Sequence, residues 1–359
     1  MTQIIGGHNL GLQFGSYTIL NRNDTTGKGT LGHGAQPLVN VANGNLVFME
    51  RDAYLPSLGE DFDLVRTYNS RGEGTGWTYS TNVTLVAHQD SPIAGGNVTG
   101  YTVTYGDGTS FDLNYDSSRQ VWVSKDGAGA FETLQSLAKA AADGATYIVT
   151  RADQSQYRFD KNYNLLAIVD TNAVSTTFTY QGGKLTRVND DAGHVITLNY
   201  AGLGTLASIT DEAGVTLVSY GYTNSQLTSV TDRHGHVTVY HYNSNGLIDS
   251  ITMPDRQTVN GVVQQFAART VSFQYQSVSW DDHPYNLTPF DKGNQWVLTQ
   301  ITDAEGGVTS CEYGFVFGNG LAPNDRDLAF KPFRPPIPVR VQNAVLSKPP
   351  ASRSTPLSP

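Results

Sequence analysis

The sequence predicts an all-β fold made of consecutive β-hairpins that pair into one long, curled antiparallel sheet. Three observations lead to this expectation. A hairpin-length unit repeats along the second half of the chain, turn residues separate short β-branched and aromatic runs, and the 359 residues include 37 Gly and 19 Tyr. Gly is typical of turns and Tyr of strands. A unit that recurs at a fixed interval is the signature of a repeat architecture.

The repeat unit is clearest between Leu227 and Tyr242. It opens on an apolar residue, places an Asp five residues later and a Gly three residues after the Asp, and closes on a Tyr. Four copies keep this frame, with seven or eight residues from Gly to Tyr. The repeat-defining residues are Asp190, Gly193 and Tyr200; Asp211, Gly214 and Tyr222; Asp232, Gly235 and Tyr242; and Asp303, Gly306 and Tyr313.

These residue types indicate a structural role for the frame. The Asp can accept hydrogen bonds from backbone N–H groups of a turn, and the Gly tolerates a positive φ. One hairpin is only marginally stable in water, so successive hairpins must pair into a larger sheet, in which the closing tyrosines are expected to stack as a ladder. A β-propeller is the alternative fold. Its blades would repeat every 40–45 residues or so, whereas the period here is close to twenty.

The chain divides into four segments. Residues 1–33, rich in Gly and Asn, form a loosely ordered lead-in, and residues 34–160 form an introductory β-domain of short strands. Within it, Gly106-Asp-Gly108 is the strongest cue for a tight hairpin turn. Residues 131–143 have apolar residues at helical spacing, but the all-β surroundings favour a strand there.

The repeat sheet spans residues 161–320, with an insertion at about 253–295. Its first unit is degenerate, because Ala173 stands where Gly is usual. The tail, 321–359, holds nine of the fifteen prolines and carries six Lys or Arg against two Asp, which makes it +4 and the rest of the chain −13. Because proline lacks the N–H donor, Lys331–Pro338 is not expected to pair in a sheet, and the tail is expected to be disordered or polyproline-like.

Composition and motifs exclude several function classes. A formal charge of −9 argues against nucleic-acid binding, which requires a basic face. Residues 1–20 lack the features of a signal peptide, and no stretch approaches the roughly 18 apolar residues of a membrane span. The single cysteine, Cys311, is expected to be a buried strand residue.

No catalytic, cofactor-binding or metal-binding residues are predicted, so the chain is expected not to be an enzyme. The Asp residues recur about every twenty positions, whereas a calcium site needs several oxygens within one loop. His234, His236 and His241 form the only histidine cluster, but His236 and His194 fill the same slot of the repeat. The hydrolase motif Gly-x-Ser-x-Gly is absent.

The repeat unit resembles the YD repeat of rearrangement-hotspot (RHS) proteins. Asn43–Val47 and Leu64–Ser70 are similar to the segment that introduces the repeats in large bacterial RHS proteins, so the resemblance covers roughly residues 34–313. It implies a β-cage-like shell that encloses a toxin domain, and a secreted or cell-surface location. Because the repeats are too few to close a cage, the chain corresponds to an early, truncated part of such a shell.

Two functions are therefore expected. The first is a non-catalytic shell or scaffold segment of a polymorphic toxin, whose partner is a toxin cargo or the remainder of a larger RHS polypeptide. The alternative is a cell-surface adhesion or carbohydrate-binding module with a glycan partner, since Tyr and Trp beside Asn and Asp suit sugars.

Overall fold

The computed structural model describes residues 3–5, 37–40, 44–55, 62–72, 74, 76–90, 96–124, 131–202, 204–253, 256–259, 262–265, 268–281, 292–314 and 337–344. Every regular element in these ranges is a β-strand, which confirms the predicted fold class. The strands form a small sheet near the N-terminus, one long sheet and a separate hairpin.

The small sheet, here called the N-terminal sheet, has the strand order β1 (Gln3–Ile5), β2 (Pro37–Asn40), β3 (Asn45–Leu55), β4 (Phe62–Asn69) and β5 (Trp77–Tyr79). β1 and β2 are parallel, and the other neighbours are antiparallel. The separate hairpin consists of β22 (Arg256–Val259) and β23 (Val262–Gln265).

The long sheet, here called the wall, contains every other strand. Its early strands are β6 (Thr84–Gln89), β7 (Val98–Thr104), β8 (Ser110–Asp116), β9 (Val121–Ser124), β10 (Thr133–Ser136), β11 (Tyr147–Thr150) and β12 (Gln156–Phe159). The repeats supply β13 (Leu165–Val169), β14 (Ser175–Gln181), β15 (Lys184–Asn189), β16 (Val195–Tyr200), β17 (Leu206–Thr210), β18 (Thr216–Thr223), β19 (Gln226–Asp232), β20 (Val237–Tyr242) and β21 (Ile248–Met253). The last strands are β24 (Arg269–Asp281), β25 (Lys292–Thr302), β26 (Val308–Gly314) and β27 (Ile337–Ala344).

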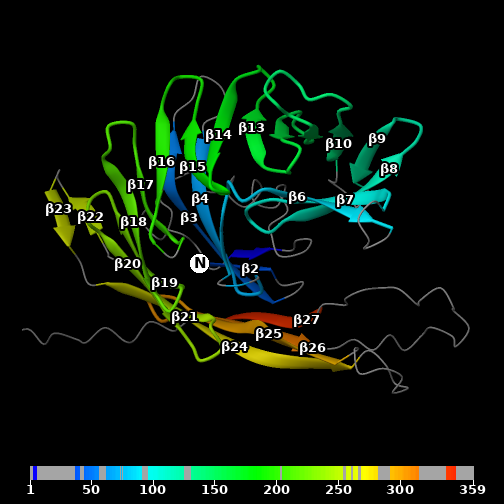
Figure 1. Cartoon of the computed structure of the whole chain (residues 1–359). Coiled ribbons are helices and arrows are strands. Elements are labelled where there is room, and N and C mark those ends of the chain that lie inside the picture. The colour runs from blue at the N-terminus through cyan, green and yellow to red at the C-terminus, as the bar shows by residue number, and fades with distance from the viewer. Residues whose placement is uncertain are drawn as a thin grey trace, which may run out of the picture.

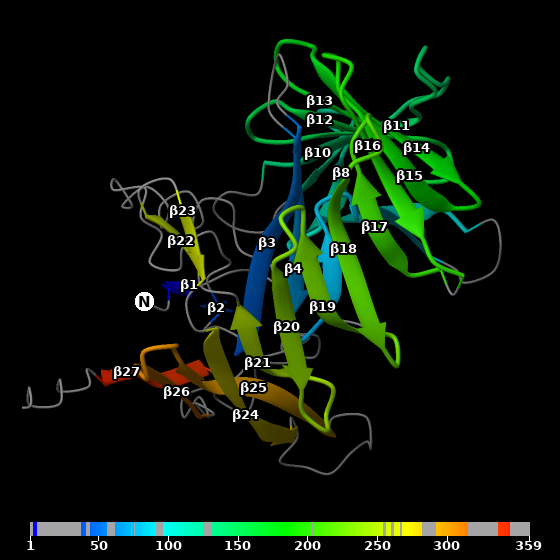
Figure 2. The same ribbon diagram turned by 90° about the vertical axis from the view of Figure 1, so that its left-hand side faces the viewer.

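Each wall strand pairs antiparallel with the next along the chain, with β24 following β21. No residue pair among the described strands joins β6 to β27, so the wall is an open, curled sheet. Figures 1 and 2 show it curving around β3 and β4. One continuous series of this kind is not the arrangement of a β-propeller, whose blades are separate four-stranded sheets.

The boundary between the two sheets falls between Tyr79 and Thr84. The early strands from β6 to β12 therefore lie in the same sheet as the repeats, and residue 160 marks a change of sequence pattern within that sheet. Part of the segment 253–295 is β24, which pairs with both β21 and β25.

Every repeat hairpin contains a β-bulge at the same place. The register shifts immediately before the closing residue at Tyr180, Tyr200, Tyr222 and Tyr242, and again before Tyr275. A bulge bends its strand and increases the local right-handed twist. Because the same bulge recurs from hairpin to hairpin, the wall curls in one direction.

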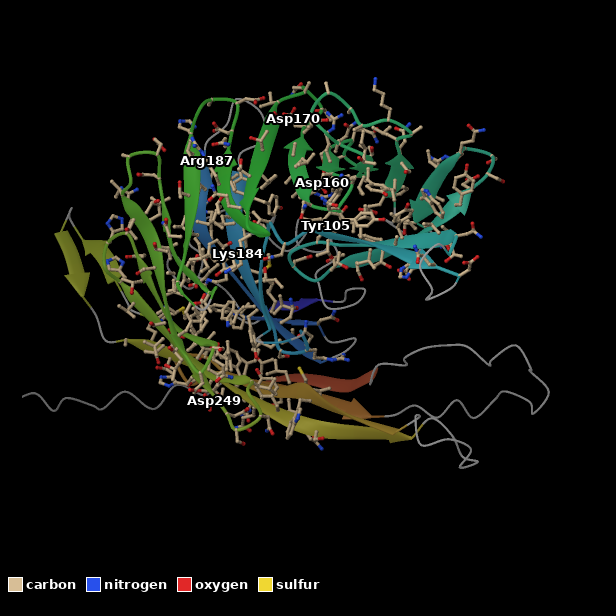
Figure 3. All side chains as sticks on the ribbon, in the orientation of Figure 1. Tyr105, Asp160, Asp170, Lys184, Arg187 and Asp249 are labelled. Atoms are coloured by element: carbon tan, nitrogen blue, oxygen red, sulfur yellow. The ribbon has the colours of Figure 1, made fainter. Side chains whose placement is uncertain are left out.

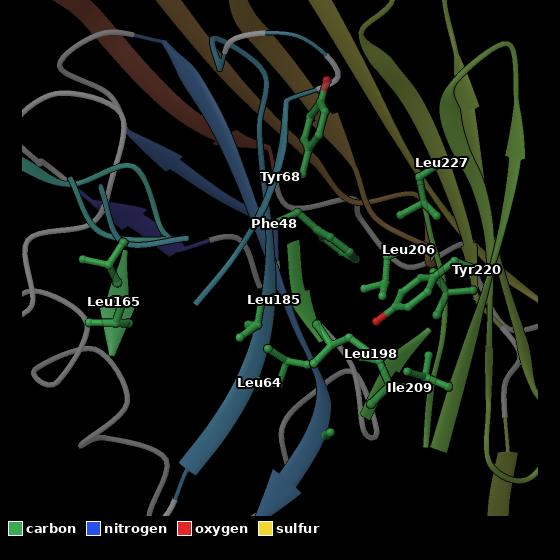
Figure 4. Packing of buried hydrophobic residues seen from close by; sticks show 14 of the residues in the cluster. Phe48, Leu64, Tyr68, Leu165, Leu185, Leu198, Leu206, Ile209, Tyr220 and Leu227 are labelled. Atoms are coloured by element: carbon green, nitrogen blue, oxygen red, sulfur yellow. The ribbon is translucent and has the colours of Figure 1, made fainter. Parts of the chain in front are cut away.

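The hydrophobic core lies between the N-terminal sheet and the concave face of the wall. In β4, Phe62 and Leu64 are buried while Asp63 between them is exposed, as a strand with one face on a core requires. Figure 4 shows Phe48 and Leu64 of the N-terminal sheet close to Leu198 and Tyr220 of the wall. Burying each of these large apolar side chains stabilises the fold by about 1.5–3 kcal/mol.

Two uncertain segments take strand conformation. Thr133–Ser136, in the stretch where a helix competed with a strand, is β10, and it pairs with β9 and β11. Ile337–Ala344, in the tail expected to stay out of a sheet, is β27, with Pro338 opposite Tyr313. β27 is the last strand in the described series, and an edge position tolerates proline because one side of its backbone needs no partner. The rest of the tail, and residues 1–33 apart from β1, lie outside the described residues.

Candidate functional site

The most unusual cluster of side chains lies where the N-terminal sheet meets the wall, and it is centred on Arg66. Arg66 comes from β4, and its side chain is 0% exposed. Around it lie the carboxylates of Glu50 and Asp52 from β3 and the phenols of Tyr220 and Tyr240 from β18 and β20. These five residues are here called the Arg66 cluster.

The guanidinium of Arg66 uses all of its nitrogens. Its Nε donates to Oδ2 of Asp52 at 3.0 Å, and its Nη2 donates to Oε2 of Glu50 at 2.5 Å. The third nitrogen, Nη1, donates to the hydroxyl of Tyr240 across the interface at 2.9 Å. A buried charge is tolerated when it is both paired and hydrogen-bonded, and Arg66 meets both conditions.

The two tyrosines of the wall complete the cluster. The hydroxyl of Tyr220 donates to Oδ2 of Asp52 at 2.6 Å, and the hydroxyl of Tyr240 donates to Oε2 of Glu50 at 2.7 Å. Arg66 also lies 4.7 Å from the ring centroid of Trp77 in β5. Every polar group of the cluster therefore has a partner, and both sheets contribute to the network.

Local backbone geometry brings the two carboxylates to one face. Glu50 lies directly opposite Arg66 in the β3–β4 ladder, and Asp52 is the extra residue of a bulge between Arg51 and Ala53. Bulges often redirect a side chain in this way. As a result Glu50 and Asp52 both reach the single guanidinium.

Burial sets the electrostatics of the cluster. Burial raises the pKa of the Asp52 carboxyl, and Arg66 offsets only part of that rise. Burial alone would lower the pKa of Arg66, but Asp52, Tyr240 and Glu50 hold it well above its ordinary value, so the guanidinium stays charged. Burial also raises the pKa values of Tyr220 and Tyr240, which remain protonated donors.

Further polar contacts extend the interface along the wall. Nε1 of Trp77 donates to the hydroxyl of Tyr242 at 2.9 Å, and that hydroxyl donates to the backbone oxygen of Leu227 at 2.7 Å. The backbone N–H of Ile248 donates to the hydroxyl of Tyr68 at 3.1 Å. The N-terminal sheet is thus bonded directly to β20 and β21.

Two turns also join the sheets through close backbone approach. The backbone oxygen of Gly44, before β3, accepts a hydrogen bond from the N–H of Leu298 in β25 at 2.8 Å. The backbone oxygen of Gly106, in the β7–β8 turn, accepts from Oγ1 of Thr78 in β5 at 2.5 Å. A Cβ on Gly44 would lie 2.5 Å from Cβ of Val297, and one on Gly106 would overlap the backbone oxygen of Tyr79. Glycine is required at both contacts because no larger residue fits.

The repeat-defining Asp and Gly residues form turns, as the frame suggests. Oδ1 of Asp211 accepts from the N–H groups of Ala213 and Val215, and Oδ1 of Asp232 accepts from those of His234 and His236. Oδ1 of Asp303 accepts from the N–H groups of Glu305 and Gly307 in the same way, and Oδ1 of Asp190 accepts from the N–H of His194. The φ angles of Gly193, Gly214, Gly235 and Gly306 are 91°, 77°, 80° and 83°.

The hydroxyl group of a closing tyrosine bonds to the first residue of its own repeat unit. The hydroxyl of Tyr200 donates to the backbone oxygen of Leu185 at 2.8 Å, just as Tyr242 bonds to Leu227. Among the described residues no ring pair joins two of Tyr180, Tyr200, Tyr222 and Tyr242, so the expected ladder of stacked rings is replaced by hydrogen bonds. Tyr313 lies in β26, where its backbone is opposite Pro338 of β27, and its side chain lies outside the described residues.

The repeat residues do not converge on one point. Figure 3 shows Asp170, which caps the degenerate first unit, at the upper rim of the wall, and the other Asp turns follow one another from hairpin to hairpin. His236 and His194 each bring Nδ1 to the Asp of their own turn, at 2.6 and 2.8 Å. No group of three His, Cys, Asp or Glu within the described ranges could hold a metal ion. Cys311 is buried, as expected.

Sequence reasoning missed the Arg66 cluster, although a signal was present. Arg66 occupies the same alternating set of positions as Phe62, Leu64 and Tyr68, all of which are buried. A charged residue on the apolar face of a strand indicates a buried partner. The partners Tyr220 and Tyr240 lie more than 150 residues away in sequence, and no local pattern identifies them.

Two protein families match the chain. Residues 144–315 match the teneurin YD-shell, and residues 37–113 match a domain of unknown function, DUF6531. A comparison with curated proteins found no match.

Three solved structures are distantly similar. The crystal structure of TcdB2-TccC3-Cdc42 is 14% identical with a TM-score of 0.31, and the match covers 75% of this chain and 15% of that one. For TcdB2-TccC3-TEV the identity is 9%, the TM-score 0.31 and the coverage 84% and 20%. A porin-like protein from Bacteroides uniformis is 12% identical with a TM-score of 0.27, and the match covers 64% of this chain and 95% of that one. The chain thus spans 15–20% of the TcdB2-TccC3 chains, and TM-scores this low say nothing of activity.

A curled wall whose successive repeat units carry an Asp turn and a closing Tyr defines a repeat-built β-shell. The two family matches, over residues 144–315 and 37–113, support the resemblance to the RHS/YD-repeat family. The role of this chain is that of a shell or scaffold segment. In the described part of the chain, no helix is long and apolar enough to cross a membrane.

Proposed function

We propose that this chain is a non-catalytic segment of the shell of an RHS-type polymorphic toxin, and that the complete shell encloses or presents a toxin domain. The observation that carries the proposal is the wall itself, which is curled and has its apolar face on the concave side. Its partners would be the toxin and the remaining repeats of a longer polypeptide, delivered outside the cell or to its surface.

The Arg66 cluster supports a scaffold role. It joins the introductory strands to repeat strands about 150–190 residues away. Its charged groups form hydrogen bonds and ion pairs that hold the two sheets together. A catalytic acid or base must reach a substrate, whereas Arg66 has no exposed surface and each carboxylate already accepts hydrogen bonds from Arg66 and a tyrosine.

The parent locus provides the first test. Repeats that continue beyond residue 313, followed by a distinct C-terminal domain, would support the proposal. An unrelated neighbour in all reading frames would contradict it.

The second test is protease protection of the complete polypeptide encoded by that locus. The C-terminal domain is expected to resist digestion until the shell is unfolded. Arg66→Met should make it sensitive under native conditions, because the N-terminal sheet loses its anchor. Arg51→Met is the matched control, since Arg51 pairs with Asp63 at an exposed site. Equal sensitivity in wild type, variant and isolated C-terminal domain would refute enclosure.

The alternative of a carbohydrate-binding module draws little support from the repeat tyrosines. Tyr200 and Tyr242 are partly buried against the core, and their hydroxyls bond to the backbone. A sugar platform needs free ring faces and free hydroxyls. Specific binding on a glycan array that is lost in Tyr200→Ala would restore this alternative.

A further inference from the structure

Five aromatic side chains form a continuous strip across the early strands of the wall. The ring centroids of Tyr115 and Trp122 are 5.0 Å apart, and those of Trp122 and Tyr101 are also 5.0 Å apart. The strip continues from Tyr101 to Tyr147 at 5.9 Å and from Tyr147 to Tyr163 at 4.8 Å. These five residues are here called the aromatic strip.

The aromatic strip is a continuation of the core face of the wall. Trp122 lies opposite Tyr115 and Leu134, and Tyr101 lies opposite Leu113. Residues directly opposite one another share a face of the sheet, and Leu113 and Leu134 are fully buried core residues. Yet Tyr115 is 50% exposed, so the apolar face extends beyond the part that is covered.

The N-terminal sheet covers a different part of the wall. Its strand β5 contacts the β7–β8 turn at Gly106, which precedes β8. Tyr115 lies near the other end of β8, five residues after Ser110, a separation of about 17 Å along the strand. The N-terminal sheet therefore leaves the end of the strip at Tyr115 exposed.

The chain itself contains a segment with the matching chemistry. Residues 345–359 follow β27 and hold four prolines, one Lys, one Arg and no acidic residue, which makes the segment +2 and the rest of the chain −11. Proline-rich segments bind aromatic surfaces in the polyproline II conformation. Fifteen residues can extend up to about 50 Å from Ala344.

We propose that residues 345–359 dock in cis on the aromatic strip, with prolines against Tyr115 and Trp122. This docking does not depend on whether the shell encloses a toxin, so either proposal can fail without the other. It assigns the proline-rich tail a binding surface within its own chain.

Photo-crosslinking in the full chain tests the proposal. A benzoylphenylalanine placed at Ser352 is irradiated, and the crosslinked peptides are mapped by mass spectrometry. Intramolecular crosslinks to β8 and β9 are expected. Tyr115→Ser should reduce their yield several-fold, because it removes the exposed end of the strip without opening the core.

Tyr54→Ser is the matched control. Tyr54 is 43% exposed, similar to Tyr115, but it lies on β3, so its loss should leave the crosslinks unchanged. Crosslinks between two molecules would assign the strip to a second copy and overturn docking in cis. Crosslinks that are scattered over the wall, or equal yields in Tyr115→Ser and wild type, would also overturn it.

Discussion

At the scale of single residues, Arg66 shows how a β core holds a charge. The guanidinium is fully buried, and its charge is balanced by Glu50 and Asp52 from the neighbouring strand. Tyr220 and Tyr240 each add a hydrogen bond to one of those carboxylates, on the oxygen that Arg66 also contacts. Removing Arg66 takes away the charged partner of both carboxylates at once, so the network is most sensitive to substitution at that residue.

Arg66→Met is expected to lower the free energy of unfolding by about 3–5 kcal/mol, because it leaves two carboxylates facing apolar surroundings. Urea denaturation followed by circular dichroism measures the change. Arg51→Met, which breaks only the exposed pair with Asp63, should cost about 1 kcal/mol or less. Similar losses in the two variants would mean that the Arg66 cluster does not stabilise the interface.

Glu132 is a second buried carboxyl, outside the Arg66 cluster. It is 5% exposed, and its Oε2 has no hydrogen-bond partner among the described residues. Burial raises the pKa of Glu132, and Arg151 offsets this only in part. In the unfolded chain the pKa returns to its ordinary value. Between the two pKa values the folded protein holds more protons, so its stability falls as pH rises through that window.

Glu132→Gln removes this titration. The melting temperature of wild type should therefore fall relative to that of Glu132→Gln as pH rises from about 4 towards neutrality. Melting curves of both proteins across that range measure the difference. Parallel curves would show that Glu132 does not titrate with a raised pKa.

At the scale of the element, the repeat hairpin combines one turn, one bulge and one tyrosine bond. The Asp and Gly positions were predictable because they act within four residues of each other. The bulge before each closing Tyr was not predictable, since a one-residue shift in register leaves no residue type of its own. The turn at Asp170 keeps the left-handed backbone conformation without the usual Gly, because Ala173 in that position has a φ of 64°.

The preference for Gly at the left-handed turn position can be tested by removing a Gly and by introducing one. Gly214→Ala should lower stability by about 1 kcal/mol through backbone strain alone, since a Cβ there meets nothing within 4 Å. Ala173→Gly should raise stability by up to about 1 kcal/mol, because relief of strain exceeds the entropy that glycine adds to the unfolded chain. Differential scanning calorimetry of both variants checks the opposite signs. Changes of the same sign would contradict this account of the turn.

The β10 stretch shows where local pattern fails. Apolar residues at helical spacing around Leu134 competed with a strand, and pairing to β9 and β11 decided the outcome. Tertiary pairing overrides weak local propensity. The all-β context was the better guide because each neighbouring segment already supplied a strand to pair with.

At the scale of the whole molecule, the fold class followed from the repeat, but the relation between the two sheets did not. Nothing near Gly106 in the sequence indicates that its turn contacts β5, and nothing near Tyr240 indicates Arg66. These contacts join segments that are far apart in the chain. From one sequence, the residue types that make these contacts can be read, but which residue contacts which cannot.

Gly106→Ala tests whether the N-terminal sheet and the wall behave as one unit. The added methyl group would overlap the backbone of Tyr79, so backbone must move and a loss of about 2–4 kcal/mol is expected. Hydrogen exchange should accelerate in β5 and in the β7–β8 turn. Gly202→Ala is the control, because a Cβ there meets nothing within 4 Å. Unchanged exchange in β5 would show that the contact is not needed for docking.

The bulge that recurs in every repeat hairpin has a consequence for how such walls evolve. Each hairpin bends the sheet by its own increment, independently of the hairpins further along. Duplication of one hairpin would therefore lengthen the arc by one step and leave the shape of every other step unchanged. The number of repeats therefore sets how far the arc extends at an unchanged radius, and unequal recombination alone could lengthen or shorten the wall without any change in how neighbouring hairpins pack.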